Sequence, residues 1–342
     1  MGATIKKIFS DDVPLVYSLL HLQAGNEDYL VAASEEENGS AYAYNLNKNY
    51  EKQAIWQNIG GTMTMVQVSD SLDFLATQRF FPGFNAASCE LVKLSFDGTG
   101  WNQTKIMDFP YLHRFDLIEG PDKMYFIGAT ITEHKEFSDD WRTPGQIYVG
   151  EYRQETNELI GLTRLDEPLV KNHGYCAFSE KGYSFVTSEE GVFCLRYPSA
   201  ESDWQLTKVY DLPVSDIAAI DTDDDGKFNY YLVINNFHGQ TLTILNDRFQ
   251  AIKEISGKFP FAHSIWGGVF NGEACFVFGN REGKQDYYLL KVREEFGEVQ
   301  VELVKIDEQV GSTNTTVFQK NQQDLLVSAN REINQVAIYV ES

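Results

Sequence analysis

Short apolar runs of the kind that form β-strands recur along the whole chain, and this repetition constrains the fold more than any other feature. Examples are DYLVAAS, KMYFIGA, YYLVINN and DLLVSAN, which are rich in Val, Ile, Phe and Tyr and are separated by Gly, Asn and Asp. Such runs with turn residues between them are typical of β-sheets. The sequence has no amphipathic helical pattern longer than two turns and no alternation of long strands with long helices. It therefore predicts an all-β protein.

The runs fall into repeating units with a period of about 50 residues, which is the length of a four-stranded propeller blade. The units begin near Val16, Thr62, His113, His173, Asp216, His263 and Asn314. The pattern predicts a seven-bladed β-propeller of four-stranded blades, forming a single domain over residues 1–342.

The two ends of the chain complete one blade in this interpretation. The last unit, from residue 311 onward, has only three β-like runs, and the N-terminal ATIKKIF has no partner before the first unit begins. Pairing the two supplies a fourth strand and covers an edge that would otherwise be open. We therefore expect the N-terminal strand to close the last blade.

Two insertions interrupt the period, FFPGFNAAS (residues 80–88) and ITEHKEFSDDWRTPGQ (residues 131–146). Each lengthens the corresponding loop of its own unit. Long loops on a rigid scaffold carry function more often than the strands do.

The composition narrows the classes of partner. The chain has 50 acidic and 28 basic residues and a formal net charge of −22. Because such a surface repels phosphate backbones and anionic lipid, we expect neither a nucleic-acid nor a membrane partner. The four cysteines, Cys89, Cys176, Cys194 and Cys275, lie in apolar runs without CxxC spacing, which predicts buried thiols. With no signal-peptide pattern at the N-terminus, we expect a cytoplasmic protein.

Polar residues are expected to gather at one face of the propeller. The innermost strand of each blade starts at that face, and the loop between the second and third strands opens on it. The strand starts supply His113, His173 and His263, and the loops after the second strands supply His238, Arg79, Arg281, Arg331 and Glu332. Taken singly, each of these is a solvated loop residue or a packed side chain; together they indicate a site.

The residue types at this face favour a divalent transition metal, because imidazole is a common ligand of zinc, manganese and iron. The candidate metal ligands are His113, His173, His238 and His263. The candidate catalytic residues are Arg281, Arg331 and Glu332, since arginines hold oxyanions and a carboxylate can remove a proton. The candidate substrate-binding residues are Arg79, Trp266 and Asn314.

A second motif has the spacing of a calcium loop. The run from Asp221 to Asn229 matches D-x-D-x-D-G, which predicts ligands at Asp221, Asp223, Asp225, the backbone of Lys227, and Asn229. Leu232 stands where a helix-loop-helix hand has its Glu, so the loop is expected to join two strands. An acidic hairpin turn without metal is the alternative.

The run DTDDDGKFNYYLVINNFHG (residues 221–239) resembles the repeat of FG-GAP and VCBS proteins, in which an Asp-rich calcium loop links the first two strands of a blade. The wider layout is similar to the propeller of aldos-2-ulose dehydratases and related sugar lyases. That resemblance implies a divalent metal held by channel-mouth histidines, which polarises a keto-sugar.

Two functions compete on these grounds. The first is a metal-dependent lyase or isomerase that acts on a small-molecule carbohydrate. The second is a non-catalytic propeller scaffold that binds a protein, a peptide or a carbohydrate, since the fold alone does not choose between them. The oligomeric state is not indicated by the sequence. P-loop, dinucleotide-binding and G-x-S-x-G patterns are absent from the sequence, which sets those enzyme classes aside.

Overall fold

The computed structural model describes residues 4–81, 86–295 and 297–341. Within them the chain forms 28 β-strands and two single-turn 3-10 helices, η1 (Ser179–Lys181) and η2 (Arg331–Ile333). The all-β prediction is therefore confirmed.

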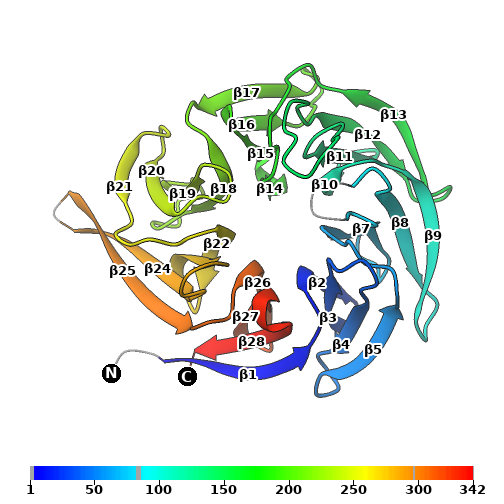
Figure 1. The fold of residues 1–342 in the computed structure, drawn as a ribbon, viewed down its shortest axis with the longest axis horizontal. Helices are drawn as coiled ribbons and strands as arrows, with labels where there is room; N and C mark the ends of the chain where they lie inside the picture. Colours follow the sequence, from blue (N-terminus) through cyan, green and yellow to red (C-terminus); the bar gives the residue numbers. More distant parts are fainter. Residues whose placement is uncertain (1–3, 82–85, 296, 342) are drawn as a thin grey trace. The chain divides into compact units, whose positions relative to one another are not determined.

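The strands form seven four-stranded sheets, each called a blade and numbered along the chain (Figure 1). Blade 1 contains β2 (Val16–Ala24), β3 (Glu27–Ser34), β4 (Ala41–Asn45) and β5 (Glu51–Trp56). Blade 2 contains β6 (Met65–Gln67), β7 (Phe74–Gln78), β8 (Glu90–Phe96) and β9 (Trp101–Asp108). Blade 3 contains β10 (Leu112–Glu119), β11 (Met124–Thr130), β12 (Ile147–Arg153) and β13 (Glu158–Arg164). Blade 4 contains β14 (Tyr175–Phe178), β15 (Tyr183–Ser188), β16 (Gly191–Arg196) and β17 (Gln205–Tyr210).

The remaining blades follow the same order. Blade 5 contains β18 (Val214–Ile220), β19 (Tyr230–Asn235), β20 (Thr241–Asn246) and β21 (Ala251–Glu254). Blade 6 contains β22 (Ala262–Phe270), β23 (Glu273–Asn280), β24 (Tyr287–Glu295) and β25 (Glu298–Asp307). Blade 7 contains β26 (Ser312–Lys320), β27 (Gln323–Asn330), β28 (Gln335–Glu341) and, from the N-terminus, β1 (Ile5–Asp12).

The chain divides into two compact units. Tyr17–Ser188 with Phe193–Thr207 holds most of blades 1 to 4, and Met1–Val16, Glu189–Val192 and Lys208–Ser342 hold blades 5 to 7. Within each unit, apolar side chains fill the space between neighbouring blades. Tyr29 of blade 1, for example, packs edge-on against Trp101 of blade 2 at 5.4 Å between ring centroids. That the whole chain is a single domain stays a prediction.

The predicted closure of the last blade is confirmed. β1 pairs antiparallel with β28 over seven residue pairs, from Ile5 opposite Glu341 to Asp12 opposite Gln335. In Figure 1 the blue N-terminal strand runs beside the red C-terminal one. Without β1, the outer edge of β28 would expose unpaired backbone groups.

The first strand of four blades shifts register against the second at the same place. The residue passed over is His113 in β10, Ser215 in β18, His263 in β22 and Thr313 in β26. The sequence interpretation took Asp216 and Asn314 as the strand-start residues of their blades, and this is wrong by one position. A bulge adds one residue to one strand, so a count along the sequence misses it. The counterpart of Asp216 and Asn314 in β10 is Arg114, not His113.

The two insertions differ in how far the structure describes them. Residues 82–85 of the first lie outside the described residues. The second connects β11 to β12, where the buried Asp140 carboxylate accepts hydrogen bonds from the Glu136 amide and from Nε and Nη2 of Arg142. Because its own polar groups hold this loop together, it is an ordered part of blade 3.

Candidate functional site

His263 lies at the register shift of β22, with its side chain 3% exposed. Its Nδ1 is 2.8 Å from the carbonyl oxygen of Thr313 in the next blade. Because a carbonyl only accepts hydrogen bonds, Nδ1 carries the proton of the neutral ring and Nε2 carries the lone pair. Metal-binding histidines are commonly oriented by a carbonyl in this way.

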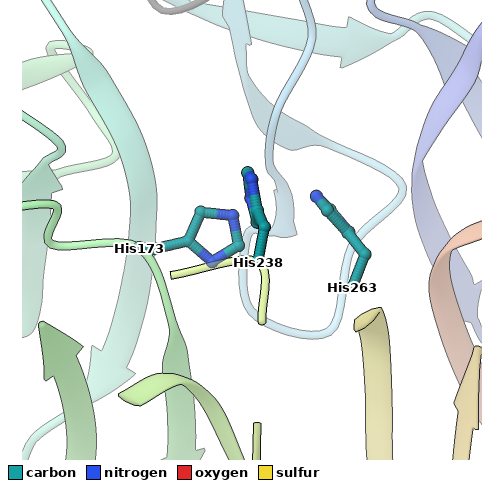
Figure 2. A group of neighbouring side chains, drawn as sticks. All are labelled: His173, His238 and His263. Carbon is teal, nitrogen blue, oxygen red and sulfur yellow. The ribbon is translucent and has the colours of Figure 1, made fainter. Parts of the chain in front are cut away.

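His238 stands beside His263, in the loop after β19 (Figure 2). Its backbone is in the left-handed region, with φ of 48°, which is uncommon for a residue other than glycine. Its half-buried ring lies between Phe237, at 3.9 Å, and Phe261, at 4.2 Å, and is 5.1 Å from the His263 ring. The strained backbone thus holds two imidazoles side by side.

Phe261 connects this histidine pair to the predicted arginines. Its ring is nearly parallel to that of His263, at 6.0 Å, and the Arg281 guanidinium lies over it at 4.7 Å. Arg281 Nε and Arg331 Nη1 both donate to Oε1 of Glu332, each at 2.9 Å. The three predicted catalytic residues therefore form one cluster, which touches the histidine pair through Phe261.

Gly311 makes room for this cluster. A Cβ there would be 2.2 Å from Cγ of Glu332, and the backbone has a φ of +60°. Both facts favour glycine, so the position of the Glu332 carboxylate depends on the residue that precedes β26.

His113 and His173 form a second pair in the other unit. Their ring centroids are 4.7 Å apart, and both side chains are almost fully buried. His113 Nδ1 is 3.1 Å from the His173 carbonyl oxygen, and its Nε2 is 3.5 Å from the Tyr17 hydroxyl. Both ring nitrogens of His113 thus face polar groups of the protein. That all four histidines meet at one ion involves both units and stays a prediction.

Threonine makes the same link between blades elsewhere. Thr64 Oγ1 donates to the His113 carbonyl at 2.9 Å, and Thr313 Oγ1 donates to the Val16 carbonyl at 3.2 Å. Side-chain bonds to the main chain of the next blade are therefore a repeated structural device. The Nδ1 atoms of His113 and His263 form bonds of this kind, so a structural role explains these two nitrogens without any ligand.

The predicted substrate-binding residues have other partners. Arg79 Nε donates to Glu90 Oε1 at 3.0 Å. Trp266 packs against an apolar cluster between blades 6 and 7 that includes Phe270 and Val277. Asn314 accepts a hydrogen bond from the Thr315 amide through Oδ1. None of these contacts brings the three side chains to the histidines.

Sequence reasoning missed Arg114, which directly follows His113 on β10. Its half-buried guanidinium donates to two main-chain carbonyls, Met63 at 3.2 Å and His173 at 3.4 Å, and lies 5.9 Å from the Tyr17 ring centroid. No local signal in the sequence marks it, because the register shift of β10 is what makes Arg114 the counterpart of Asn314, which the sequence analysis did select.

A polar network follows Arg114 on the same strand. The Tyr175 hydroxyl donates to Asp116 Oδ2 at 3.0 Å and meets Ser184 Oγ at 2.7 Å, and Ser184 Oγ is 2.6 Å from the Tyr197 hydroxyl. Burial raises the pKa of Asp116 to about 6. Burial likewise raises the pKa of Tyr175 well above its usual value.

The predicted calcium loop joins β18 to β19, at the opposite end of blade 5 from His238, as expected from its place between the first two strands. Oxygens of Asp221, Asp223 and Asp225 lie within 4.8 Å of one another. Asp221 Oδ1 is buried and has no hydrogen-bond partner among the described residues. The nearby Asp221 side chain raises the pKa of Asp223.

A surface hollow of about 350 Å³ lies at the far end of β10, lined among others by Glu119, Lys123 and Arg153. It contains none of the predicted site residues. In the described part of the chain, no helix has the length and apolar character needed to cross a membrane.

No protein-family model matches the sequence, and a search of curated proteins finds no similar chain. The WD40 β-propeller domain of Doa1 is similar in structure, with a TM-score of 0.62 over 99% of this chain and 97% of that one. This chain is a seven-bladed β-propeller. At 8% sequence identity the likeness concerns the fold alone. None of these comparisons supports the predicted likeness to FG-GAP proteins or sugar lyases, which stays a prediction from the acidic loop and the histidine positions.

Proposed function

We propose that this propeller binds a divalent transition-metal ion through His173, His238 and His263 and acts on a keto-sugar as a metal-dependent lyase or isomerase. The observation that carries the proposal is the His238–His263 pair, in which a carbonyl 2.8 Å from Nδ1 of His263 orients that ring. An imidazole held this way presents Nε2 to zinc, manganese or iron. His173 precedes the first strand of its own blade and supplies the third nitrogen.

The bound metal would polarise the keto oxygen of the sugar. This chain's residues would bind and orient the substrate. Arg281 would hold the developing oxyanion, and the half-exposed ring of Phe261 would contact the apolar face of the sugar. Glu332 accepts hydrogen bonds from both arginines, so we assign it the positioning of those guanidinium groups rather than proton transfer.

His113 fits a structural role better than a ligand role. Its Nδ1 donates to the His173 carbonyl and its Nε2 faces the Tyr17 hydroxyl, so coordination would require the Tyr17 contact to break. Through the His173 carbonyl, His113 would instead orient the backbone next to a ligand, as residues behind metal ligands commonly do.

The test is the metal content of protein purified without chelators, together with turnover of a panel of keto-sugars. We expect about one transition-metal ion per chain. His238→Gln and His263→Gln should each lower metal content and turnover at least tenfold, whereas His134→Gln, in the exposed part of the 131–146 loop, should change neither. A metal-free wild-type protein, or equal metal content in all four proteins, would contradict the proposal.

One observation favours the non-catalytic scaffold as a second candidate. The bonds from His113 and His263 to carbonyls of neighbouring blades are matched by those of Thr64 and Thr313, so these histidines also fit a purely structural role. In that case His263→Gln should lower the melting temperature while no metal is found in any variant. The same set of proteins therefore separates the two functions.

We further propose that the loop from Asp221 to Asn229 binds one Ca²⁺ with a structural role. Three clustered carboxylates and a buried carboxylate oxygen without a hydrogen-bond partner among the described residues support the proposal. A cation among these oxygens would offset their mutual repulsion.

A further inference from the structure

We propose that Arg114 binds the anionic group of the substrate, a carboxylate or phosphate carried by the sugar. The inference deepens the proposed function by naming the substrate class, and it rests on that function for the sugar itself. The anion site, however, is argued from contacts of Arg114 alone and can be tested without the metal.

Arg114 differs from the other half-buried arginines in its partners. Arg281 and Arg331 each contact the Glu332 carboxylate. Arg114 contacts the carbonyl oxygens of Met63 and His173 and the ring of Tyr17, and none of the described carboxylates lies within ion-pair distance of it. Charged groups that are removed from water are usually paired with an opposite charge. A half-buried arginine without a carboxylate partner is therefore unexpected in a chain of net charge −22.

The acidic residue nearest to Arg114 in the sequence has other partners. Asp116 lies two residues along β10, on the same face of the strand. Its carboxylate instead accepts hydrogen bonds from the Tyr175 hydroxyl at 3.0 Å and from the Leu117 amide at 2.8 Å. Asp116 therefore bonds to Tyr175 and the Leu117 amide rather than to the Arg114 guanidinium.

The guanidinium is held in place but retains donors for a ligand. Its contacts with Met63, His173 and Tyr17 come from three separate segments of the chain and restrict its position. They use one N–H on Nε and one on Nη1, whereas a guanidinium has five N–H groups in a rigid fork. The remaining donors have the geometry that binds carboxylate or phosphate through two parallel hydrogen bonds. Because the side chain is half-buried, such bonds would be less screened than at the open surface.

The test measures binding of gluconate, glucose 6-phosphate and uncharged glucose by calorimetry, at matched ionic strength. We expect one of the anions to bind the wild-type protein at least tenfold more tightly than glucose, and the better anion identifies a carboxylate or a phosphate as the group. Arg114→Gln should remove this preference. Arg248→Gln, a change at an exposed arginine, is the matched control and should retain it.

Two further variants separate a loss of anion binding from a loss of folding and from a loss of metal. Arg114→Lys retains the charge without the planar fork and should weaken anion binding at least threefold even if the Gln variant does not fold. His263→Gln should still bind the anion, so loss of metal and loss of anion binding are separate results. Equal binding of anions and glucose by the wild-type protein, or an unchanged preference in a folded Arg114 variant, would overturn the proposal.

Discussion

The residue at the register shift of a first strand decides how that strand contacts its neighbour. His263 occupies this position in β22, and its ring donates to the carbonyl oxygen of Thr313 in blade 7. Thr313 occupies the same position in β26, and its hydroxyl donates to the carbonyl oxygen of Val16 in blade 1. Buried carbonyls need such partners, because an unsatisfied one costs on the order of 1–3 kcal/mol.

We expect Thr313→Val to destabilise the protein by about 1–2 kcal/mol. Valine has nearly the same shape, but it lacks the hydroxyl that contacts the carbonyls of Val16 and Ala329, both at 3.2 Å. The measurement is the midpoint of urea unfolding. Thr316→Val, on the half-buried part of the same strand, is the control. Equal midpoints for the two variants would mean that the hydroxyl of Thr313 does not stabilise the contact between blades.

The carboxyl group of Asp116 should make stability depend on pH. Its folded-state pKa of about 6 lies above the ordinary value near 3.8, so between these values the folded protein holds a proton that the unfolded chain has lost. The free energy of unfolding should therefore fall as pH rises from about 4 to about 6, by on the order of 2 kcal/mol.

Asp116→Asn should remove that part of the pH dependence and should be more stable than the wild-type protein at pH 7. Urea unfolding midpoints between pH 4 and pH 8 provide the measurement. If the midpoints of the two proteins ran parallel over this range, Asp116 would be ionised in the folded state throughout.

At the scale of elements, most of the candidate site residues lie in loops rather than in strands. The strands of each blade supply a regular frame, whereas His238, Arg281 and Glu332 all lie in connections that follow second strands. The acidic loop between β18 and β19 is at the other end of blade 5, so a calcium ion there would stabilise the frame without touching the histidines.

Removing calcium with EGTA should lower the melting temperature of the wild-type protein, and Asp223→Ala should abolish this sensitivity. Asp221, Asp223 and Asp225 lie close enough to repel one another without a cation. Asp203→Ala, which changes an exposed aspartate away from the loop, should behave like the wild-type protein. Melting curves that do not respond to EGTA in any of the three proteins would show that the loop is an acidic turn.

At the scale of the whole molecule, the ends of the chain meet in one sheet. β1 is the fourth strand of blade 7 and pairs with β28, more than 320 positions away in the sequence. Because closing so long a loop costs chain entropy, we expect this pairing to form late in folding.

Deleting residues 1–12 should cause aggregation or a large loss of stability, because the outer edge of β28 would then be unpaired. Size-exclusion chromatography and thermal melting measure both effects. Deleting residues 1–3 is the control, since the pairing with β28 begins at Ile5. A monomeric long truncation with an unchanged melting temperature would mean that β1 is dispensable.

Local patterns in the sequence were sufficient for the architecture. Period-two apolar runs, the spacing of about 50 residues and a last unit one strand short predicted seven four-stranded blades closed by the N-terminus. The position of the acidic loop followed from the same count of strands. Each of these features depends on residues near one another in the chain, which is why sequence patterns reveal them.

The partners of the site residues were decided only by the tertiary structure. The register shift at His113 and His263 moves the following residue to the opposite face, and nothing in the local pattern marks it. Arg79 and Arg281 both directly follow the second strand of a blade. In the structure Arg79 pairs with Glu90, whereas Arg281 pairs with Glu332. Arg114 donates hydrogen bonds to the carbonyl oxygens of two residues that lie 51 and 59 positions away in the sequence. Contacts at such separations depend on how blades pack, and composition or spacing along one chain does not encode them.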